Sequence, residues 1–417
     1  MPGLQQPPLA RATLLDVAQR AGVSRSTASL AFSGAGPVSA ATRDRVKAAA
    51  AELGYSGPDP RARSLRQGRS GVVGIVFDET LLAAFRDPVN VATLDGIASG
   101  LGTGSNGLLL LTEAPVVEAG GSLAAEQDSE AHARAATQAA RDAEPATASP
   151  SPIESAAIDA AVLMGCAPAF GRVVESLRRR GVPIVSIEGG PEAGVVDIAL
   201  DNADASETLA RHLHDLGHRR VATVTLATDV ERRAGFVDAA REAATTTTVT
   251  ADRLAGLRRV YPEAVAWSSS FNLVEDGVAA ARALLAEPDP DPGNGPAADA
   301  GNDPDAGPGA AGGRTARPAA DRPTAILAQS DLLAVGVLQV AEELGLAVPG
   351  DLSVAGFDGV RIDGLAGHDL TTMRQPATAK GRAAGLAVTR MLAGEEAESV
   401  QFTCELHLGD TTGPVPV

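Results

Sequence analysis

Residues 24–30 hold side chains whose types and spacing suit contact with a nucleic acid. Arg25 can donate two parallel hydrogen bonds to O6 and N7 of a guanine, a base-specific contact in the DNA major groove. The hydroxyls of Ser24, Thr27 and Ser29 suit phosphate oxygens, which fix the register of a protein on DNA. Two alternatives stay open, because Ser24 could serve only as a helix cap and Thr27 could lie partly in a core. DNA binding then requires that one helix present these groups together.

Three short helical patterns surround this stretch. In residues 14–21 apolar side chains recur at the spacing of an amphipathic helix, and Gly22 follows, a residue suited to the left-handed conformation that ends a helix. A second helix is predicted over 25–32, and Ser39 is placed to cap a third over 40–53. Two short helices joined by a glycine turn form a helix-turn-helix, which lays its second helix in the major groove. The residues expected to pack the helices together are Ala18, Val23, Ala28, Val46 and Leu53.

The elements DVAQRAGVS, STAS, VSAATRDRV, AAAAELGY and ARSLR follow one another in this order between residues 13 and 66. Their order and content resemble the DNA-binding headpiece of the LacI-type (lactose-repressor-like) family of bacterial transcription regulators. The resemblance implies that Arg25, Ser26 and Leu30 occupy the positions that select the operator sequence. Many relatives carry a polar or basic residue at the position of Leu30, so this leucine either touches a thymine methyl or simply packs.

Residues 58–70 are polar and interrupted by proline, a composition typical of a linker. In the family this segment forms a short hinge helix when a dimer sits on its operator, and paired leucines wedge into the minor groove and kink the DNA. The resemblance implies this role for Leu65, with Arg63 beside it. Residues 59–61 (Asp-Pro-Arg) replace the usual Asn-Ala, but proline is tolerated at the first position of a helix, so the hinge helix is still expected. Inserting such a leucine costs free energy because it unstacks bases. The resulting bend in the DNA allows more contacts between protein and DNA.

The charge of the chain is uneven. The whole sequence has a formal net charge of −17, whereas residues 1–70 contain ten Lys and Arg against four Asp and Glu, which gives +6 there and −23 for the remainder. A basic head on an acidic body confines contact with a polyanion to the head and repels DNA elsewhere. The charge of +6 alone would fit a solvated charged face better, and the ordered headpiece motifs are what favour DNA.

Cysteine usage and hydropathy bear on the compartment. Cys166 and Cys404 are the only cysteines and lie far apart, so a disulfide framework or a zinc site is not expected and a reducing cytosol fits. No run of eighteen apolar residues occurs, and the Pro-rich residues 1–12 lack the apolar core of a signal peptide and are expected to be a disordered tail. The sequence therefore predicts a cytoplasmic, nucleoid-associated protein with no membrane partner.

From residue 71 onward apolar strands alternate with helices, the pattern of βαβ units and a doubly wound parallel sheet. The first series has predicted strands at 72–77, 107–111, 160–164 and 182–187. A second series is expected to open at Asp197 and to contain a helix over ERRAGFVDAAREA (231–243), with LRRVY (257–261) between that helix and the next. Its other strands are predicted at 221–226, 324–328 and 352–358.

The resemblance extends over nearly the whole chain apart from two insertions. It implies the fold class α/β, in which a helix-turn-helix headpiece (13–57) is followed by a two-lobed periplasmic-binding-protein-like effector and dimerisation domain (71–417) with two doubly wound parallel sheets. The first lobe is expected at about 71–196 plus 375–395, and the second at about 197–370 plus 400–417. Of the two low-complexity insertions, the first, about 116–155, is predicted to be a polar insertion, part of which could form a loose helix from Glu126 to Arg141. The second, about 288–323, has too few large apolar residues to offset the entropy of ordering and is predicted to be a disordered loop.

Arg232 and Asp358 match family positions that contact the effector. A ligand between two α/β lobes binds at the carboxyl ends of the strands. Arg232 in ERRAGF matches the arginine that holds effector hydroxyls or carboxylates, and its five-donor fork suits vicinal hydroxyls or an anion. Asp358 in GFDG matches an aspartate that accepts hydrogen bonds from effector hydroxyls. For each carboxylate the alternative is a solvated or capping group.

Three further polar residues take positions that resemble contact sites in relatives. Ser330 in AQSD and Glu188 after VPIVSI fall where relatives have polar contacts, and Asn272 falls where they often place an aromatic ring. The next residue along from the serine, Asp331, is expected instead to cap the helix 332–344. Aromatic residues make up only 3% of the chain, so stacking on a sugar is scarce and the exchange at Asn272 indicates a smaller or more polar effector. A sugar or related polar metabolite is expected, without further identity.

An enzyme would need a nucleophile, a metal cluster or a phosphate loop. His212, His214 and His218 could suggest a metal, but offsets of two and six residues spread them around a helix, so core or cap roles are expected. No catalytic residue, metal or cofactor is predicted. A pure solute-binding module is the second alternative, and the headpiece and the missing export signal argue against it.

The predicted function is a sequence-specific transcriptional regulator, a repressor whose DNA affinity a small-molecule effector modulates. Two headpieces must meet a two-fold operator, so a homodimer on double-stranded operator DNA is expected. An activator or a corepressor-dependent regulator of the same fold is the alternative that the sequence does not separate.

Overall fold

In the computed structural model the chain divides into two compact units, Met1–Gly71 and Val72–Val417. The structure describes residues 12–33, 37–55, 68–102, 106–112, 151–165, 170–286, 318, 320, 322–361 and 367–415. We refer to residues 12–55 as the headpiece and to residues 72–415 as the body. Nearly all of the predicted tail, most of the hinge with Arg63 and Leu65, and most of both insertions lie outside the described residues.

The headpiece has three helices, α1 (Leu14–Ala21), α2 (Arg25–Ser33) and α3 (Ala40–Glu52), each within one residue of its predicted bounds. Thr13 and Asp16 form a capping box at the start of α1, and Gly22 ends that helix with a φ of 65°. Ser39 caps α3, because its hydroxyl accepts a hydrogen bond from the backbone N–H of Thr42 at 3.2 Å. Polar caps therefore set the boundaries of these short helices.

One small core holds the three helices together. Its buried residues are Val17, Ala18, Ala28, Ala31, Val46, Ala49 and Ala50, with Val23 partly buried beside them. The prediction that Leu53 completes this core is wrong, since its side chain is 37% exposed. Leu53 occupies the C-cap, just past the last turn of α3. Phe32 and Tyr55 instead cover this side of the core, with ring centroids 5.6 Å apart in an edge-to-face contact.

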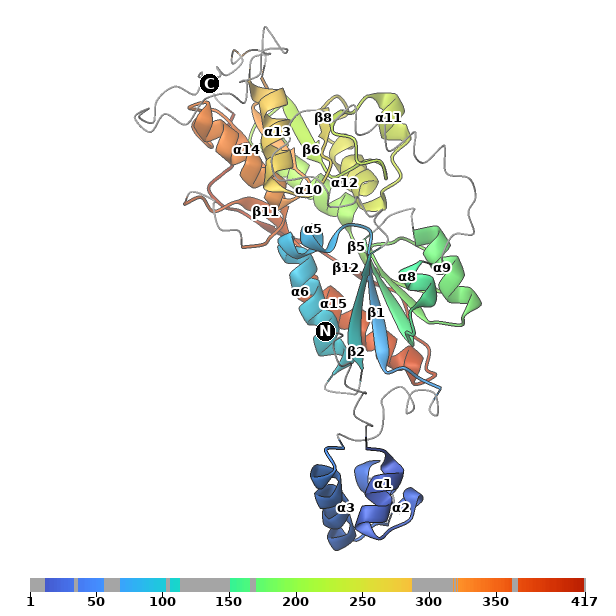
Figure 1. Ribbon diagram of the computed structural model, residues 1–417. Coiled ribbons are helices and arrows are strands. Elements are labelled where there is room, and N and C mark those ends of the chain that lie inside the picture. Colours follow the sequence, from blue (N-terminus) through green and yellow to red (C-terminus); the bar gives the residue numbers. More distant parts are fainter. Residues whose placement is uncertain are drawn as a thin grey trace, which may run out of the picture. The chain divides into compact units, whose positions relative to one another are not determined.

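Lobe 1 of the body is a parallel six-stranded sheet in the order β12-β5-β4-β3-β1-β2, with helices on both faces (Figure 1). The strands are β1 (Val72–Phe77), β2 (Gly107–Thr112), β3 (Ala160–Met164), β4 (Ile184–Ile187), β5 (Val195–Leu200) and β12 (Val400–Phe402). Helices α6 (Pro88–Leu101) and α15 (Ala377–Leu392) pack on one face, and α8 (Pro152–Ser155) and α9 (Phe170–Arg179) on the other. A short helix, α5 (Leu81–Arg86), precedes α6.

Two strands lie in a different lobe from the one predicted. Asp197 lies in β5, which pairs with β4 and β12 of lobe 1, so the chain enters the second lobe after Leu200 and not at Asp197. Strand β12 (Val400–Phe402), expected in the second lobe, likewise belongs to lobe 1. The chain connects β4 to the parallel strand β5 through a loop without a helix. Strand–helix alternation, the rule behind the prediction, therefore misplaced the boundary.

Lobe 2 is a seven-stranded sheet in the order β13-β11-β10-β9-β6-β8-β7, parallel except for the edge strands β7 and β13. The strands are β6 (Val221–Thr225), β7 (Gly235–Phe236), β8 (Val265–Ser268), β9 (Ala325–Ala328), β10 (Ser353–Asp358), β11 (Thr371–Arg374) and β13 (Glu405–His407). Helices α13 (Val274–Leu285) and α14 (Asp331–Glu343) pack on one face, and α10 (Asn202–Asp215) and α12 (Thr248–Arg258) on the other. The predicted doubly wound α/β architecture is thus present in both lobes (Figure 1).

Two local predictions in lobe 2 are wrong. The helix expected over 231–243 is absent from most of that range, where the structure has a loop, the strand β7 (Gly235–Phe236) and the short helix α11 (Ala239–Ala243). LRRVY (257–261) lies at the end of α12, and the strand follows it at Val265–Ser268. Polar side-chain contacts that no sequence pattern reveals hold the loop.

Within the described residues the chain passes between the lobes at three places. These are the start of α10 at Asp201, the segment between β11 and α15 at Gln375, and the segment between β12 and β13 at Cys404. The first and third are bonded together, because the Asp201 carboxylate accepts from the Cys404 backbone N–H at 2.9 Å and the Asp201 N–H donates to the carbonyl of Phe402 at 3.0 Å. Lobe movement must therefore bend these crossings together.

Helices α6 and α15 of lobe 1 meet through glycine. Gly96 and Gly100 on α6 face Gly381 and Gly385 on α15, and an added methyl at any of them would overlap backbone atoms of the other helix. At Gly381 the methyl would overlap the carbonyl oxygen of Thr93. The two backbones are thus in direct contact, which a larger residue at these positions would prevent.

The end of the first predicted insertion is ordered and buried. Residues 152–155 form α8, whose Ile153 is fully buried in the core against α9. Ser151 and Glu154 form its capping box. The last residues of the predicted insertion therefore belong to the packed core of lobe 1. In the part of the chain that the structure describes, no helix has the length and hydropathy needed to cross a bilayer.

Candidate functional site

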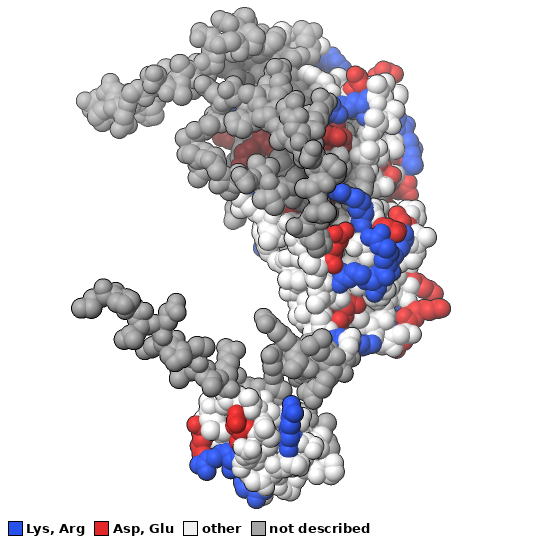
Figure 2. Space-filling model, turned by 45° about the vertical axis from the view of Figure 1, so that its right-hand side comes forward, with Lys and Arg blue, Asp and Glu red and all other residues white. Residues whose placement is uncertain are grey.

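The headpiece presents the residues predicted to touch DNA along α2. Ser24, Arg25 and Ser26 are exposed at its start, Thr27 and Ser29 are half-buried, and the side chain of Leu30 is 37% exposed. The Ser24 hydroxyl accepts from the backbone N–H of Thr27 at 3.1 Å and lies 2.8 Å from its hydroxyl, so Ser24 does cap the helix. Arg25 extends from the same turn, and Leu30 stays accessible for an apolar contact. Figure 2 shows both basic and acidic side chains on the visible faces of the headpiece and of the body.

In the body a cavity of about 580 Å³ lies between the two lobes. Both lobes contribute at the carboxyl ends of their strands, the usual place for a ligand in an open α/β sheet. Its charged and amide lining residues are Asp78, Glu79, Asp87, Asn90, Glu188, Asp229, Glu231, Arg232, Arg253, Asn272, Asp358, Gln375 and Lys380. Four of the five residues predicted to bind an effector are among them, and Ser330 is not.

Glu188 lies at the floor of the cavity and is held by a buried lysine. It follows β4 in the left-handed region at a φ of 59°, and its carboxylate accepts from Lys380 Nζ and from Asn202 Nδ2, the latter at 2.8 Å. Burial alone would raise the pKa of Glu188, but the charges of Lys380 and Arg253 outweigh it and hold the pKa below its usual value. Lys380 also donates to Gln375 on one of the crossings between lobes. Glu188 is therefore an ionised anchor tied to both lobes.

Asp358, at the end of β10, pairs with the buried guanidinium of Arg253. The nearest nitrogen and oxygen are 3.6 Å apart, and the side chain of Arg253 is only 4% exposed. Arg253 also donates to Asn202 Oδ1 at 2.8 Å and lies 3.7 Å from the ring centroid of Phe357. Burial raises the pKa of Asp358 well above its usual value, and Arg253 offsets this only partly. Gln375 Nε2 donates to Asp358 at 2.6 Å. Gln375, Lys380, Glu188, Asn202 and Arg253 are bonded in turn, and the contact between Arg253 and Asp358 closes them into a ring of side chains.

Contacts across the mouth of the cavity join the lobes. Arg232 in lobe 2 donates to the carbonyl of Asp78 at 3.3 Å and lies 3.6 Å from its carboxylate, with its guanidinium 5.3 Å from the ring centroid of Phe271. Asn272 in lobe 2 donates to Asp87 in lobe 1 at 2.9 Å. Burial raises the pKa of both aspartates. Arg232 and Asn272 thus contact the opposite lobe. A ligand in the cavity would have to compete for these contacts or bridge the two lobes itself.

Ser330 and Asp331 have roles that differ from those predicted. Ser330 is fully buried and is itself the cap of α14, because its hydroxyl accepts from the Leu333 backbone N–H at 3.2 Å. Its hydroxyl also donates to Asn272, so it supports a cavity residue. Asp331 is the first residue of α14 and accepts from the hydroxyl of Thr372 at 2.6 Å. Burial raises the pKa of Asp331 to about 7. The capping prediction was therefore one residue off.

Seven charged residues of the cavity were not predicted from the sequence. They are Asp78, Glu79, Asp87, Asp229, Glu231, Arg253 and Lys380. Asp78 and Glu79 directly follow the buried strand β1, so the rule that ligands bind at strand carboxyl ends would have found them. Arg253 and Lys380 lie within helices, where nothing local distinguishes a buried cation from a solvated one.

Glu79 should make the stability of the folded protein depend on pH. Burial, together with the neighbouring Asp78 charge, raises the pKa of Glu79 from 4.5 to about 7. Because the folded protein binds this proton more tightly, the stability that Glu79 contributes is complete below pH 4.5 and is lost as the pH rises through 7. Glu79→Gln, which can still accept from Asn90, should therefore be more stable than the parent at pH 8 by roughly 1–2 kcal/mol, and equal to it at pH 4.

Calorimetric melting at the two pH values tests this, with the exposed carboxylate Glu263→Gln as the control. A Glu79→Gln protein whose stability follows that of the parent across the range would show that Glu79 is solvated in the folded protein.

Two of the three histidines, His212 and His218, have structural roles of the kind expected. His218 is fully buried and contacts the hydroxyls of Thr324 and Ser353 at 3.0 Å each. His212 bonds to the hydroxyl of Thr412 at 2.9 Å. Among the described residues no cluster of three or more His, Cys, Asp or Glu could hold a metal ion.

Comparisons with known proteins agree with this architecture. Residues 13–57 match the model of bacterial regulatory proteins of the lacI family, and residues 274–412 match a periplasmic binding protein-like domain. An HTH-type transcriptional regulator of Mycobacterium tuberculosis is 31% identical over 417 residues, covering 98% of each chain. The HTH-type transcriptional regulator IpsA of Corynebacterium glutamicum is 29% identical over 412 residues, covering 97% of this chain and 98% of the relative.

Solved structures share the fold. The lac repressor dimer bound to operator and the anti-inducer ONPF has a TM-score of 0.65 at 18% identity, covering 97% of this chain and 100% of that one. The complex of the transcriptional regulator CelR with cellobiose has a TM-score of 0.55 at 24% identity, covering 96% and 100%. With the helix-turn-helix and the two-lobed body in place, the chain belongs to the lacI family of bacterial regulatory proteins and is a DNA-binding transcriptional regulator, not an enzyme.

Proposed function

We propose that the protein is a repressor that binds a palindromic operator as a homodimer, and that a small polar effector in the interlobe cavity modulates its DNA affinity. The observation that carries the proposal is the cavity itself, which both lobes line with hydrogen-bonding groups at strand ends. A ligand that touches both lobes can favour one relative lobe position over another. Fold neighbours that are a repressor dimer on operator and a sugar complex support the proposal. The compartment would be the cytoplasm, at the nucleoid.

The lining favours a neutral, hydroxyl-rich effector such as a sugar or related polyol. Asp78, Glu79 and Asp87 supply carboxylate oxygens that accept from hydroxyls, and Arg232 can donate to two oxygens at once. Met164, Ile187 and Phe271 supply apolar surface for the C–H faces of a ring. The volume lies within the roughly 300–1,000 Å³ usual for small-molecule sites.

The route from cavity to DNA would pass through the crossings between lobes. Glu188, Lys380, Gln375 and Asp358 bond to one another beside the second crossing, so a ligand that alters one bond alters the strain on the others. Such a shift would change whether paired hinge segments, with Leu65 in each, can form on the operator. An activator or a corepressor-dependent regulator would use the same cavity and crossings, but the effector would have the opposite effect on DNA binding or on transcription.

A genome-wide binding footprint tests the function directly. It should return a palindromic site, and the genes beside it should indicate the class of effector. Thermal shift with a panel of monosaccharides, disaccharides, sugar alcohols and sugar acids would then identify compounds that stabilise the body. A footprint without two-fold symmetry would contradict the proposed dimer, and no stabilisation by any panel member would contradict the proposed effector class.

Arg25→Ala should weaken operator binding and relax its choice of sequence. Loss of a bidentate guanine contact should cost about 1–3 kcal/mol on the operator. Gel-shift titration at fixed salt, with the footprint site and a scrambled duplex as the control, separates base contact from phosphate contact. Leu65→Ala should in addition reduce DNA bending in a circular-permutation gel. Unchanged operator affinity in both variants would remove these residues from the DNA interface.

A further inference from the structure

The loop between β6 and α11 carries Arg232 into the cavity, and it is the segment where the predicted helix is absent. We infer that Arg241 is a positioning residue that fixes this loop so that Arg232 reaches across the cavity to Asp78. The inference rests on the proposed role of the cavity as an effector site and adds a residue outside its lining.

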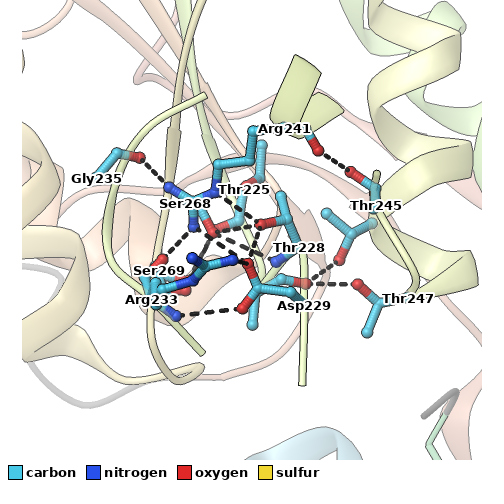
Figure 3. Close-up of polar contacts among 12 residues, drawn as sticks. Thr225, Thr228, Asp229, Arg233, Gly235, Arg241, Thr245, Thr247, Ser268 and Ser269 are labelled. Atoms are coloured by element: carbon cyan, nitrogen blue, oxygen red, sulfur yellow. Dashed lines mark hydrogen bonds and ion pairs between the residues drawn. The ribbon is translucent and has the colours of Figure 1, made fainter. Parts of the chain in front are cut away.

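Arg241 binds the loop at several points at once (Figure 3). Its Nη1 donates to the carbonyls of Gly235 and Phe236 at 3.3 Å each, and its Nη2 donates to the carbonyl of Arg233. Its Nε donates to the hydroxyl of Thr228 at 3.2 Å. The side chain is 19% exposed, so little water competes for these donors. One guanidinium therefore holds the backbone carbonyls of three residues, Arg233, Gly235 and Phe236, in a segment that is not helical.

Asp229 forms the base of the loop and holds it from the other side. This residue is 8% exposed, and its carboxylate accepts from the backbone N–H of Arg233 at 3.4 Å and from Arg233 Nη2 at 3.3 Å. Arg241 Nη2 lies 3.8 Å from the same carboxylate. Thr228 beside it is tied to β8 through its backbone N–H, which donates to the Ser268 hydroxyl at 3.3 Å. The loop is thus anchored to the sheet at its start and to Arg241 at its end.

Arg232 sits between these two anchors in an unfavourable backbone conformation. Its φ is 52°, in the left-handed region that residues with a Cβ rarely occupy. Its backbone N–H donates to the carbonyl of Asp229 at 3.2 Å, and the carbonyl of the next residue, Arg233, accepts from Arg241. Flanking bonds therefore maintain the conformation that directs the Arg232 side chain to Asp78. A lysine at position 241 has one nitrogen and could not reach all these acceptors together.

The experiment compares full-length variants by the rate at which phenylglyoxal modifies Arg232, followed by peptide mass spectrometry. In the parent protein Arg232 is bonded to Asp78 and its side chain is 25% exposed, so modification should be slow. Arg241→Ala should raise the rate several-fold. Arg233→Ala is the matched control, because the Arg233 side chain pairs with the same carboxylate but is 70% exposed, and the loop carbonyls accept from Arg241 instead. It should leave the rate unchanged.

Trp267 gives a second readout. It is the only tryptophan of the chain, and its ring packs edge to face on Phe236, with centroids 4.8 Å apart, beside the carbonyl that Arg241 holds. Arg241→Ala should shift its emission to longer wavelength, whereas Arg233→Ala should not. If Arg241→Ala does not fold, Arg241→Lys, which keeps the charge but has one nitrogen in place of three, carries the same test.

Three results would overturn the inference: an Arg232 modification rate in Arg241→Ala equal to that of the parent, full protection of Arg232 in Arg241→Lys, or the same increase in Arg233→Ala. The proposed function is tested separately by Arg232→Ala with the sugar and polyol panel. If that variant is stabilised by the panel as the parent is, the effector role of Arg232 fails, while the modification rates still decide the positioning role of Arg241.

Discussion

Replacing Arg253 with methionine is expected to lower the free energy of unfolding of the body by about 3–5 kcal/mol, the range measured when one partner of a buried ion pair is removed. The Arg253 guanidinium faces Asp358 at 3.6 Å and the ring of Phe357 at 3.7 Å, and it bonds to Asn202. Without it, Asp358 would lose the charge that partly offsets its burial, and the ionised Glu188 would lose one of the two charges that hold its pKa low. Methionine fills part of the volume, so the loss reports mainly charge and hydrogen bonding.

Urea unfolding followed by Trp267 emission measures the effect, and a double-mutant cycle with Asp358→Asn identifies its cause. In the double variant part of the loss should be recovered, because no buried charge is left unpaired. Arg259→Ala is the control, since Arg259 forms exposed ion pairs with Asp204 and Glu207 and should cost less than about 1 kcal/mol. An equal loss of unfolding free energy in the Arg253 and Arg259 variants would show that the Arg253 charge does not offset the burial of Asp358. Strict additivity of the two losses in the cycle would show the same.

Gly381→Ala should be nearly as damaging, although it adds only one methyl group. That methyl would overlap the carbonyl oxygen of Thr93 and lie 3.0 Å from the backbone nitrogen of Ile97. The obstacles are backbone atoms of α6 and cannot rotate away, so the two helices must separate along their contact. Overpacking of this kind should cost about 3 kcal/mol, at the upper end of its usual range.

The matched control is Gly171→Ala, an exposed position in α9 where an added methyl meets nothing within 4 Å. It should be neutral or stabilising by about 0.5–1 kcal/mol, because alanine favours a helix more than glycine does. Calorimetric melting of both variants gives the comparison. A Gly381→Ala protein that melts with the parent would mean that α6 and α15 do not touch through their backbones.

The features that the sequence predicted well are those set by neighbouring residues. Gly22 and Ser39 mark the limits of headpiece helices, and each acts through residues within a few positions of itself. The strands 72–77 and 160–164 were predicted with the observed bounds, because runs of apolar residues between polar ends leave little choice of boundary. Arg232 and Asp358 line the cavity because the carboxyl ends of parallel strands meet there.

The features that the sequence missed depend on partners far along the chain. Asp197 lies in lobe 1, where β5 pairs with β12 and where Ser399, about half the chain away, accepts from the backbone N–H of Asp197 at 3.0 Å. The expected helix at 231–243 gives way to contacts that Asp229 and Arg241 make with the loop. Lys380 is buried because a glycine at the next position lets α15 approach α6 closely and because Glu188 supplies the opposite charge. None of these partners shows a periodic signal in the sequence.

The origin of α15 and β12 in the last part of the chain has a consequence for protein synthesis. On the ribosome, residues 72–200 emerge early, yet the face of their sheet that α15 covers and the edge that β12 pairs with stay open. The strands of lobe 2 up to Arg374 have all been translated before residues 377–402 can close lobe 1. The nascent chain is therefore expected to expose apolar surface while residues 201–402 are added, and a chaperone can hold it there. A message broken before codon 377 would release a product whose first lobe cannot be completed.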